Sequence, residues 1–292
     1  MTPVIEPVIG RYIQMTIENR PHRVYFEEAG QGIPLLCLHT AGSDGRQFRG
    51  LLNDPNVTSH FRVIAFDMPW HGKSSPPEGY QDEEYRLTTN GYTTLIRSFA
   101  AALGLERPVV MGCSIGGRIV LQLAAHHPTE FRALIGLQSA AWQAPWYDTS
   151  WLHRPDVHGG EVCAALVSGL AAPGGSESGR HETLWHYMQG GPGIFKGDLW
   201  FYRDDADFRG MLEDIDTSVC PLWLLTGEYD YSCSPADTRS TAAAIPGANF
   251  VEMSQLGHFP MSENYPHFAS YLHPVLDSIR AQQNDKQRRR KK

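Results

Sequence analysis

The sequence lacks the features that define several classes of protein. No run of apolar residues approaches the roughly 18 needed to cross a bilayer, so no membrane association is predicted. The N-terminal segment carries an early Glu and has no apolar core of a secretory signal. No H-E-x-x-H motif or other cluster of metal ligands occurs, and no G-x-G-x-x-G follows the first predicted strands. We therefore expect neither a metal nor a nucleotide cofactor.

Cysteine is also sparse. The five cysteines are an odd number, they are widely spaced, and no C-x-x-C pair occurs. This pattern argues against a disulfide framework and against a structural zinc site. A reducing, cytoplasmic location is the expectation that follows.

Positive charge is concentrated at one end of the chain. The formal net charge is −7, yet residues 286–292 consist almost entirely of Lys and Arg. Nucleic-acid binding needs cations clustered on the folded body, so no nucleic-acid partner is predicted. We expect residues 286–292 to form a basic disordered tail, with targeting or docking as the alternative role.

The remaining sequence has the composition of one large folded core. Aromatic residues make up 11% of the chain, which excludes disorder as its dominant state. Short apolar runs bounded by Gly, Pro and Asp predict strands at 12–17, 23–27, 34–38, 62–66, 108–111, 133–137, 221–226 and 249–253. Helical spacing of apolar residues predicts helices at 92–103, 115–126, 235–245 and 266–279. This alternation is typical of an α/β fold with a doubly wound, mostly parallel sheet.

One long segment interrupts the alternation of strands and helices. The residues between the strands at 133–137 and 221–226 are too many for an ordinary crossover, and they are rich in aromatics. We predict an inserted helical cap over 140–215, with a purely structural excursion as the alternative. The core would then comprise residues 1–139 and 216–285.

The predicted cap would lie at the edge of the sheet where ligands bind. Open α/β sheets bind ligands at the carboxyl ends of their strands. Trp142 and Trp146 are therefore expected to contact a small-molecule substrate with an apolar or aromatic portion.

The strongest motif is GCSIGG at 112–117, which follows a predicted strand and precedes a predicted helix. This is the context of a G-x-S-x-G nucleophile elbow, in which a strained turn exposes the serine hydroxyl. Ser114 is therefore the candidate nucleophile. Gly112 and Gly116 are explained by the close approach of strand and helix, where side chains would collide. Cys113 is a rival nucleophile, but its side chain should point back into the structure.

Four segments in chain order resemble the α/β-hydrolase superfamily, and the resemblance covers nearly the whole chain. They are LCLHTAG at 36–42, FDMPWHGKS at 66–74, GCSIGG at 112–117, and LLTGEYD at 224–230 with LGHFP at 256–260. The second segment corresponds to D-x-P-G-H-G-x-S, with Trp70 in place of a glycine. The resemblance implies an α/β-hydrolase core whose serine works with an acid and a histidine.

His258 is the expected general base, because imidazole titrates near neutral pH and this histidine follows the last predicted strand. The resemblance places the acid at Asp230, with Glu228 as the alternative. A related group carries its acid after the preceding strand. Gln138 or Ser139 stands there in this chain, so Asp230 is retained.

The same resemblance assigns the groups that would stabilise a developing negative charge. One backbone N–H should come from Ile115 and the other from Ala41, in the loop HTAG that stands where the family has H-G-x-G. His39 and Thr40 in this loop, and Phe259 beside the base, are assigned to the substrate site. His39 is expected to support the loop rather than transfer protons.

A serine nucleophile disfavours the epoxide hydrolases and haloalkane dehalogenases of this fold, which attack with a carboxylate. The predicted function is hydrolysis of a carboxylic ester or lactone through an acyl-enzyme. One alternative is a C–C bond hydrolase acting on a β-diketone or ring-fission-type product. Such enzymes commonly carry Asn and Trp where this chain has Cys113 and Phe259. Another alternative is a non-catalytic small-molecule binding protein. The sequence leaves the oligomeric state open.

Overall fold

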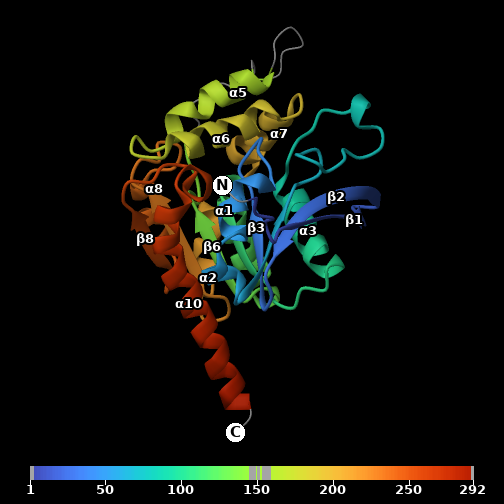
Figure 1. Cartoon of the computed structure of the whole chain (residues 1–292). Helices are drawn as coiled ribbons and strands as arrows, with labels where there is room; N and C mark the ends of the chain where they lie inside the picture. Colours follow the sequence, from blue (N-terminus) through green and yellow to red (C-terminus); the bar gives the residue numbers. More distant parts are fainter. Residues whose placement is uncertain (1–2, 145–148, 150–151, 153–158, 291–292) are drawn as a thin grey trace.

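The computed structural model describes residues 3–144, 149, 152 and 159–290, with side chains as far as Gln282. Trp146, which the sequence assigns to the substrate site, lies outside the described residues. Figure 1 shows a central sheet with helices on both sides, a group of helices above the sheet, and a long C-terminal helix that projects below it.

The sheet has eight strands in the order β1-β2-β4-β3-β5-β6-β7-β8. The strands are β1 (Ile9–Ile17), β2 (Arg20–Ala29), β3 (Ile33–Leu38), β4 (Phe61–Phe66), β5 (Val109–Cys113), β6 (Ala133–Leu137), β7 (Leu222–Gly227) and β8 (Asn249–Met253). The first two pairings in this order are antiparallel and the other five are parallel. The predicted doubly wound, mostly parallel sheet is therefore confirmed.

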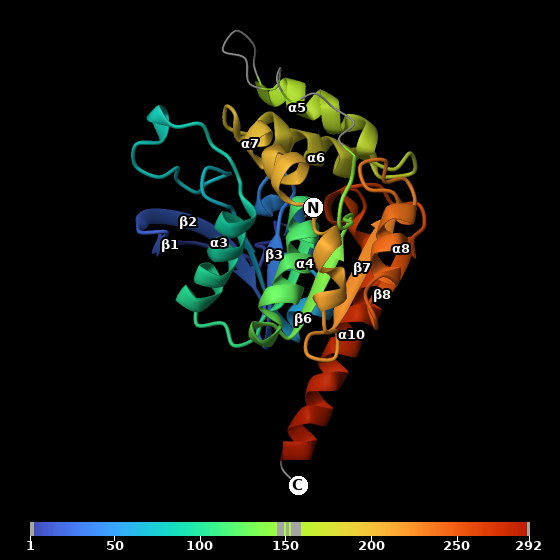
Figure 2. The same cartoon turned by 180° about the vertical axis from the view of Figure 1, so that it is seen from behind.

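The central strands are buried on both faces, as their continuous apolar runs predict. In β3, Leu36 and Leu38 belong to the apolar cluster on one side of the sheet, and Leu35 and Cys37 to the cluster on the other. The first of these faces is covered by α3 (Thr89–Ala102), α4 (Ile115–His126) and α8 (Pro235–Ala243), seen in Figure 2. The other is covered by α1 (Arg49–Leu52), α2 (Pro55–Thr58) and α10 (Tyr265–Arg290), seen in Figure 1.

Helix α10 runs further than the sequence analysis expects. Residues 286–290, which were expected to be disordered, are helical. Arg, Lys and Gln are good helix formers, and the helix is already established when the chain reaches them. Within the described residues, no helix combines the length and the hydropathy needed to cross a bilayer.

Between β6 and β7 the chain forms helices that lie over the carboxyl ends of the strands (Figure 1). They are α5 (Gly159–Val167), α6 (Glu177–Met188) and α7 (Ile194–Trp200), followed by a π-helical turn (Phe201–Asp205) and a 3₁₀ helix (Arg209–Asp214). We call residues 159–214 the cap segment. Its buried aromatic side chains, Tyr187, Phe195, Phe201, Tyr202 and Phe208, belong to the same apolar cluster as α3 and α4. The domain boundaries at 139/140 and 215/216 stay a prediction.

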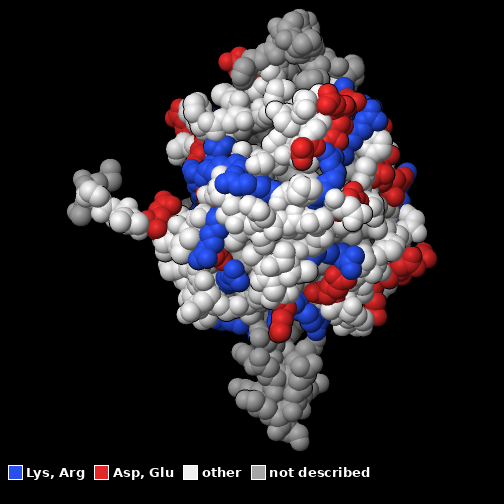
Figure 3. Space-filling model, turned by 90° about the vertical axis from the view of Figure 1, so that its right-hand side faces the viewer, with Lys and Arg blue, Asp and Glu red and all other residues white. Residues whose placement is uncertain are grey.

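The surface carries both signs of charge. On the face in Figure 3, Lys and Arg side chains form a band with Asp and Glu side chains near it. Several exposed cations have carboxylate partners, such as Arg20 with Glu83 at 2.9 Å and Lys196 with Glu84 at 3.0 Å. Exposed pairs of this kind contribute little to stability, so the fold depends on its apolar clusters.

Candidate active site

Ser114 occupies the tight turn between β5 and α4. Its backbone has φ 59° and ψ −113°, which is the strained conformation that the elbow motif predicts. A Cβ added at Gly112 would lie 2.1 Å from the carbonyl oxygen of Gly116, and one at Gly116 would lie 2.8 Å from that of Leu38. The predicted steric reason for both glycines is therefore confirmed. Ser114 lies at the carboxyl edge of the sheet, beneath the cap segment.

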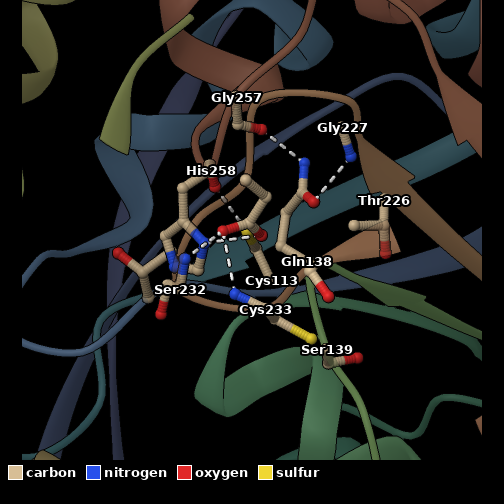
Figure 4. Close-up of polar contacts among 12 residues, drawn as sticks. Cys113, Gln138, Ser139, Thr226, Gly227, Ser232, Cys233, Gly257 and His258 are labelled. Atoms are coloured by element: carbon tan, nitrogen blue, oxygen red, sulfur yellow. Dashed lines mark hydrogen bonds and ion pairs between the residues drawn. The ribbon is translucent and has the colours of Figure 1, made fainter. Parts of the chain in front are cut away.

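His258 and Asp230 are in direct contact. Nδ1 of His258 lies 2.9 Å from Oδ2 of Asp230, and both side chains are buried. The other oxygen, Oδ1, accepts hydrogen bonds from the backbone N–H groups of Ser232 at 2.8 Å and Cys233 at 3.0 Å. Figure 4 shows Ser232 and Cys233 beside His258. The turn after β7 thus holds Asp230 in one orientation and aims it at His258.

Glu228, the alternative acid, lies elsewhere. Its carboxylate is exposed and accepts hydrogen bonds from the backbone N–H of Gln255 and the hydroxyl of Ser254. These bonds lower the pKa of Glu228. Its contacts are therefore with the turn after β8 and not with the imidazole.

Cys113 is turned away from the cavity at Ser114, as predicted. Its thiol lies 3.3 Å from the carbonyl oxygen of His258 and is fully buried. Burial raises the pKa of this thiol well above its ordinary value. A buried, protonated thiol is a poor nucleophile, so Ser114 stays the candidate nucleophile of the elbow.

In the loop after β3, the amide of Ala41 differs from those of its neighbours Thr40, Gly42 and Ser43. The N–H of Thr40 donates to Gln47 Oε1 at 3.1 Å, that of Gly42 to Asp198 Oδ2 at 2.7 Å, and that of Ser43 to the Thr40 carbonyl at 3.3 Å. Among the described residues no acceptor is recorded for the N–H of Ala41, and Ala41 lines the cavity at Ser114. This accounting supports the expected role of Ala41.

Ile115 is the first residue of α4 and follows Ser114 directly. First-turn N–H groups of a helix have no intrahelical acceptor, so its amide is free to bind a developing oxyanion. The roles of Ala41 and Ile115 as oxyanion donors stay a prediction.

Ser114 and His258 open into one small cavity with a volume of about 30 Å³. The core contributes Ala41, Ser114, Ser232, His258 and Phe259 to the lining. The cap segment contributes Leu166, Val167, Leu170, Tyr187, Phe195, Leu199 and Tyr202. The described lining contains no Asp, Glu, Lys or Arg. The cavity therefore suits an uncharged, apolar group of modest size.

The other residues assigned to the substrate site take different places. Phe259 lines the cavity as expected. Thr40 lies behind the lining, with its hydroxyl 2.6 Å from that of Tyr187. His39 supports the loop: its Nδ1 lies 2.9 Å from the Thr40 carbonyl oxygen, and its Nε2 accepts from the N–H of Met68 at 3.1 Å. Burial lowers the pKa of His39 to about 4, so it is neutral at pH 7.

Trp142 does not line the cavity. Its side chain is 37% exposed, and the guanidinium of Arg209 lies 4.3 Å from its ring centroid. The cap aromatics at the cavity, such as Tyr187 and Phe195, come instead from α6 and α7. Aromatic content alone could not distinguish these positions.

Gln138, which directly follows β6, has a supporting role that no sequence motif indicates. Its backbone has φ 55°, and its side chain accepts from the N–H of Gly227 at 2.8 Å and donates to the carbonyl of Gly257 at 2.6 Å. Figure 4 shows the amide between these two backbones. Gln138 therefore joins the strand end before Asp230 to the loop that carries His258.

Two buried carboxylates tie the cap segment to the core, and neither was predicted. Glu263, in α9 (Pro260–Glu263), accepts from the N–H groups of Gly257 and, in the cap segment, Ala172. The N–H of His258 itself donates to the Leu170 carbonyl at 2.8 Å. The second carboxylate is Asp198, whose contact with Gly42 is given above. Their contacts between the cap segment and the core join residues far apart in the sequence, so no local motif reveals them.

No group of three or more His, Cys, Asp or Glu side chains in the described part of the chain could hold a metal ion.

Comparison with known proteins supports the fold. The family model for the alpha/beta hydrolase fold matches residues 33–155. An uncharacterised protein of Mycobacterium tuberculosis is 24% identical over 288 residues, covering 90% of this chain and 81% of the relative. A pimeloyl-(acyl-carrier protein) methyl ester esterase of Aeromonas hydrophila is 33% identical over 117 residues, 40% of this chain and 42% of the relative. A 2-hydroxymuconate semialdehyde hydrolase of Pseudomonas putida is 27% identical over 158 residues, 53% of each chain.

Solved structures match over most of the chain. A thermophilic esterase from Thermogutta terrifontis superposes with a TM-score of 0.78 at 19% identity, covering 92% of this chain and 99% of that one. The enol-lactonase from Burkholderia xenovorans gives a TM-score of 0.76 at 19% identity, covering 92% of this chain and 100% of that one.

The sheet order, the strained turn after β5 and these matches place the chain in the α/β-hydrolase fold superfamily. The sequence relatives named above include a methyl ester esterase and a semialdehyde hydrolase.

Proposed function

We propose that this protein hydrolyses carboxylic esters or lactones whose acyl portion is small, apolar and uncharged. The observation that carries the proposal is the convergence of Ser114 and His258 on one cavity, with Asp230 bonded to the far nitrogen of the imidazole. A serine hydroxyl becomes a competent nucleophile only when a neighbouring base accepts its proton.

The contact with Asp230 sets the tautomer of His258. A carboxylate only accepts hydrogen bonds, so Nδ1 of His258 carries the proton and Nε2 is left as the base. In the first half-reaction Nε2 takes the proton of Ser114 while its oxygen attacks the ester carbonyl. The N–H groups of Ala41 and Ile115 stabilise the oxyanion. Collapse of the intermediate breaks the ester C–O bond, and the alcohol leaves with the proton from His258.

Water completes the cycle. Nε2 of His258 removes a proton from water as the water oxygen attacks the acyl-enzyme carbonyl. The second tetrahedral intermediate collapses, the acid is released, and Ser114 regains its proton from the imidazolium. A lactone follows the same steps, except that its alcohol and acid remain parts of one product.

The cavity lining favours ester hydrolysis over the C–C alternative. The substrate in the name of the Pseudomonas putida relative retains a carboxylate. The described lining here offers no Lys or Arg to such a group, and burial of an unpaired charge is strongly unfavourable. A neutral acyl group meets no such penalty.

The test is intact mass after treatment with a fluorophosphonate serine probe. Wild type should gain one adduct and Ser114→Ala none. Ser232→Ala is the matched control, because Ser232 lines the same cavity, and it should still be labelled. A folded wild type that gains no adduct would contradict the proposal and favour the small-molecule binding alternative.

A substrate panel then tests the chemical class. Short p-nitrophenyl esters and neutral lactones should be hydrolysed with a higher kcat/KM than matched substrates that carry a carboxylate. The reverse order, or cleavage only of a vinylogous β-diketone acid, would move the assignment to C–C bond hydrolysis.

A further inference from the structure

Asp198 is a carboxylate of the cap segment with no exposed surface. It lies in α7, and three donors from three separate core segments converge on it. Oδ2 accepts from the N–H of Gly42 at 2.7 Å and lies 2.8 Å from Nε2 of His71, and Oδ1 accepts from the hydroxyl of Tyr85 at 2.7 Å. A carboxylate withdrawn from water is stable only with such partners, so its position is tightly determined.

The contacts of His71 compensate the negative charge. Its Nδ1 lies 2.9 Å from the carbonyl oxygen of Pro69, and its Nε2 faces Asp198. Both neighbours are acceptors, so both ring nitrogens carry a proton and the ring is an imidazolium. Burial opposes this charge, but Asp198 outweighs burial and the pKa of His71 is raised. A net negative charge beside the proposed oxyanion hole would oppose catalysis, and this ion pair removes it.

The contact with Gly42 acts on the loop that holds Ala41. The two neighbouring amides are anchored by different parts of the molecule, that of Thr40 by Gln47 of the core and that of Gly42 by Asp198 of the cap segment. Ala41 stands between these anchors with its own N–H uncommitted among the described residues. Phe195, also in α7, packs against Gly42 so closely that an added Cβ would lie 2.7 Å from Cδ2 of its ring.

We propose that Asp198 is a positioning residue that fixes the oxyanion loop from the cap segment, so that the oxyanion hole is complete only when α7 is seated on the core. This inference rests on the proposed function. Asp198 lies behind the loop and does not touch the reacting atoms. It acts through the Gly42 amide on the orientation of the Ala41 N–H.

The test compares Asp198→Ala, which removes the acceptor, with Asp198→Asn, which keeps an oxygen for the Gly42 amide. Asp207→Asn is the control, because Asp207 is an exposed cap carboxylate paired only with Arg209 in the described contacts. Loss of one oxyanion donor costs about 10²–10³ in kcat. We expect Asp198→Ala to lower kcat by about 10–100-fold while KM changes less than about threefold. In Asp198→Asn, kcat should fall by less than about tenfold. Asp207→Asn should have the kcat and KM of wild type.

Inhibitor affinity separates positioning from general loosening. A trifluoromethyl ketone forms an oxyanion on Ser114, whereas the corresponding methyl ketone binds as a ground-state analogue. Asp198→Ala should weaken the trifluoromethyl ketone by the same factor as kcat/KM and leave the methyl ketone nearly unchanged. Equal weakening of both ketones, or wild-type kcat, would overturn the inference.

Amide hydrogen exchange at Gly42 provides a readout that needs no activity. Exchange should be slow in wild type, intermediate in Asp198→Asn and fast in Asp198→Ala. If Asp198→Ala fails to fold, the test uses kcat, KM and the Gly42 exchange rate of Asp198→Asn. A wild-type kcat together with a wild-type exchange rate in that variant would overturn the inference. A wild type that fails to react with the fluorophosphonate refutes the proposed function instead, which keeps the two failures distinct.

Discussion

The side-chain amide of Gln138 donates a 2.6 Å hydrogen bond to the carbonyl of Gly257, the residue before His258. Its oxygen accepts from Gly227 at the end of β7. One neutral side chain thus bonds both the N–H of Gly227, which precedes the turn of Asp230, and the carbonyl of Gly257, in the loop of His258. Both loops are buried here, so an unmatched partner would be costly.

Gln138→Glu should destabilise the protein in a pH-dependent way. An ionised Glu would place an oxygen against the Gly257 carbonyl, so the folded state should favour the protonated acid and raise its pKa. When the pKa of an acid is higher in the folded state, its contribution to folding stability is lost as pH rises above its pKa in the unfolded chain, about 4.3 for Glu. Urea unfolding should show a deficit of about 1–3 kcal/mol at pH 8 and a smaller one at pH 5. Gln81→Glu, at an exposed position, is the control. A deficit that is equal at both pH values would contradict the expected charge effect.

Asp230→Asn and Glu228→Gln should differ sharply in activity. An Asn at 230 can present its NH₂ to Nδ1 of His258, which stabilises the wrong tautomer and removes the charge that faces the imidazolium. We expect kcat to fall by about 10³–10⁴ in Asp230→Asn and by less than about threefold in Glu228→Gln. Steady-state kinetics on a neutral ester measures both. A larger loss in Glu228→Gln would transfer the role of the acid to that residue.

The fold and the central residues could be read from the sequence because their signals are local. Continuous apolar runs identify strands buried on both faces, and Gly112 and Gly116 mark the close approach around Ser114. The order of motifs then brings distant segments to one edge of the sheet. His258 and Asp230 were found for this reason, although 28 positions separate them.

The supporting residues could not be read in this way. The segment IFKGDLW around Asp198 has the mixed polarity of an exposed helix, yet the carboxylate is buried because Gly42, His71 and Tyr85 meet it. These partners are far away in the sequence and no spacing rule connects them. Trp142 is the converse case: the sequence assigns this aromatic residue to the substrate site, but it lies on the surface beside Arg209.

His186→Leu should improve stability in acid. Neither ring nitrogen of His186 has a hydrogen-bond partner among the described residues, although a Glu182 oxygen lies 3.9 Å from Nε2. Burial lowers the pKa of His186 to about 4. The unfolded chain binds a proton below about pH 6.5 and the native state does not, so stability falls as pH drops from there toward 4.

Without this histidine, the loss in free energy of unfolding between about pH 6.5 and pH 4 should be smaller by about 3 kcal/mol. Urea unfolding between pH 4 and 7 measures the effect, with His181→Leu in the exposed part of the same helix as control. If the free energy of unfolding of His186→Leu falls with decreasing pH as steeply as that of wild type, His186 is not a buried neutral group.

The ion pair of His71 with Asp198 should stabilise the fold most strongly below neutral pH. The pKa of His71 is raised, so its contribution is fully present below the unfolded value of about 6.5 and is lost as pH rises through the folded value. The groups that face His71 include Asp198, Tyr85, Asp67 and His39. Burial and then Asp44 raise the pKa of Asp67 to about 7, so Asp67 titrates in the same window.

A difference measurement isolates the pair, because Asp67 is present in both proteins compared. The free energy of unfolding of wild type minus that of Asp198→Asn should be largest near pH 6 and should shrink toward pH 9, where a neutral His71 no longer forms an ion pair. Urea titrations at half-unit pH intervals measure this difference. A difference that grows with pH would mean that His71 is neutral in the native protein, and that Asp198 is held by Gly42 and Tyr85 without a compensating positive charge.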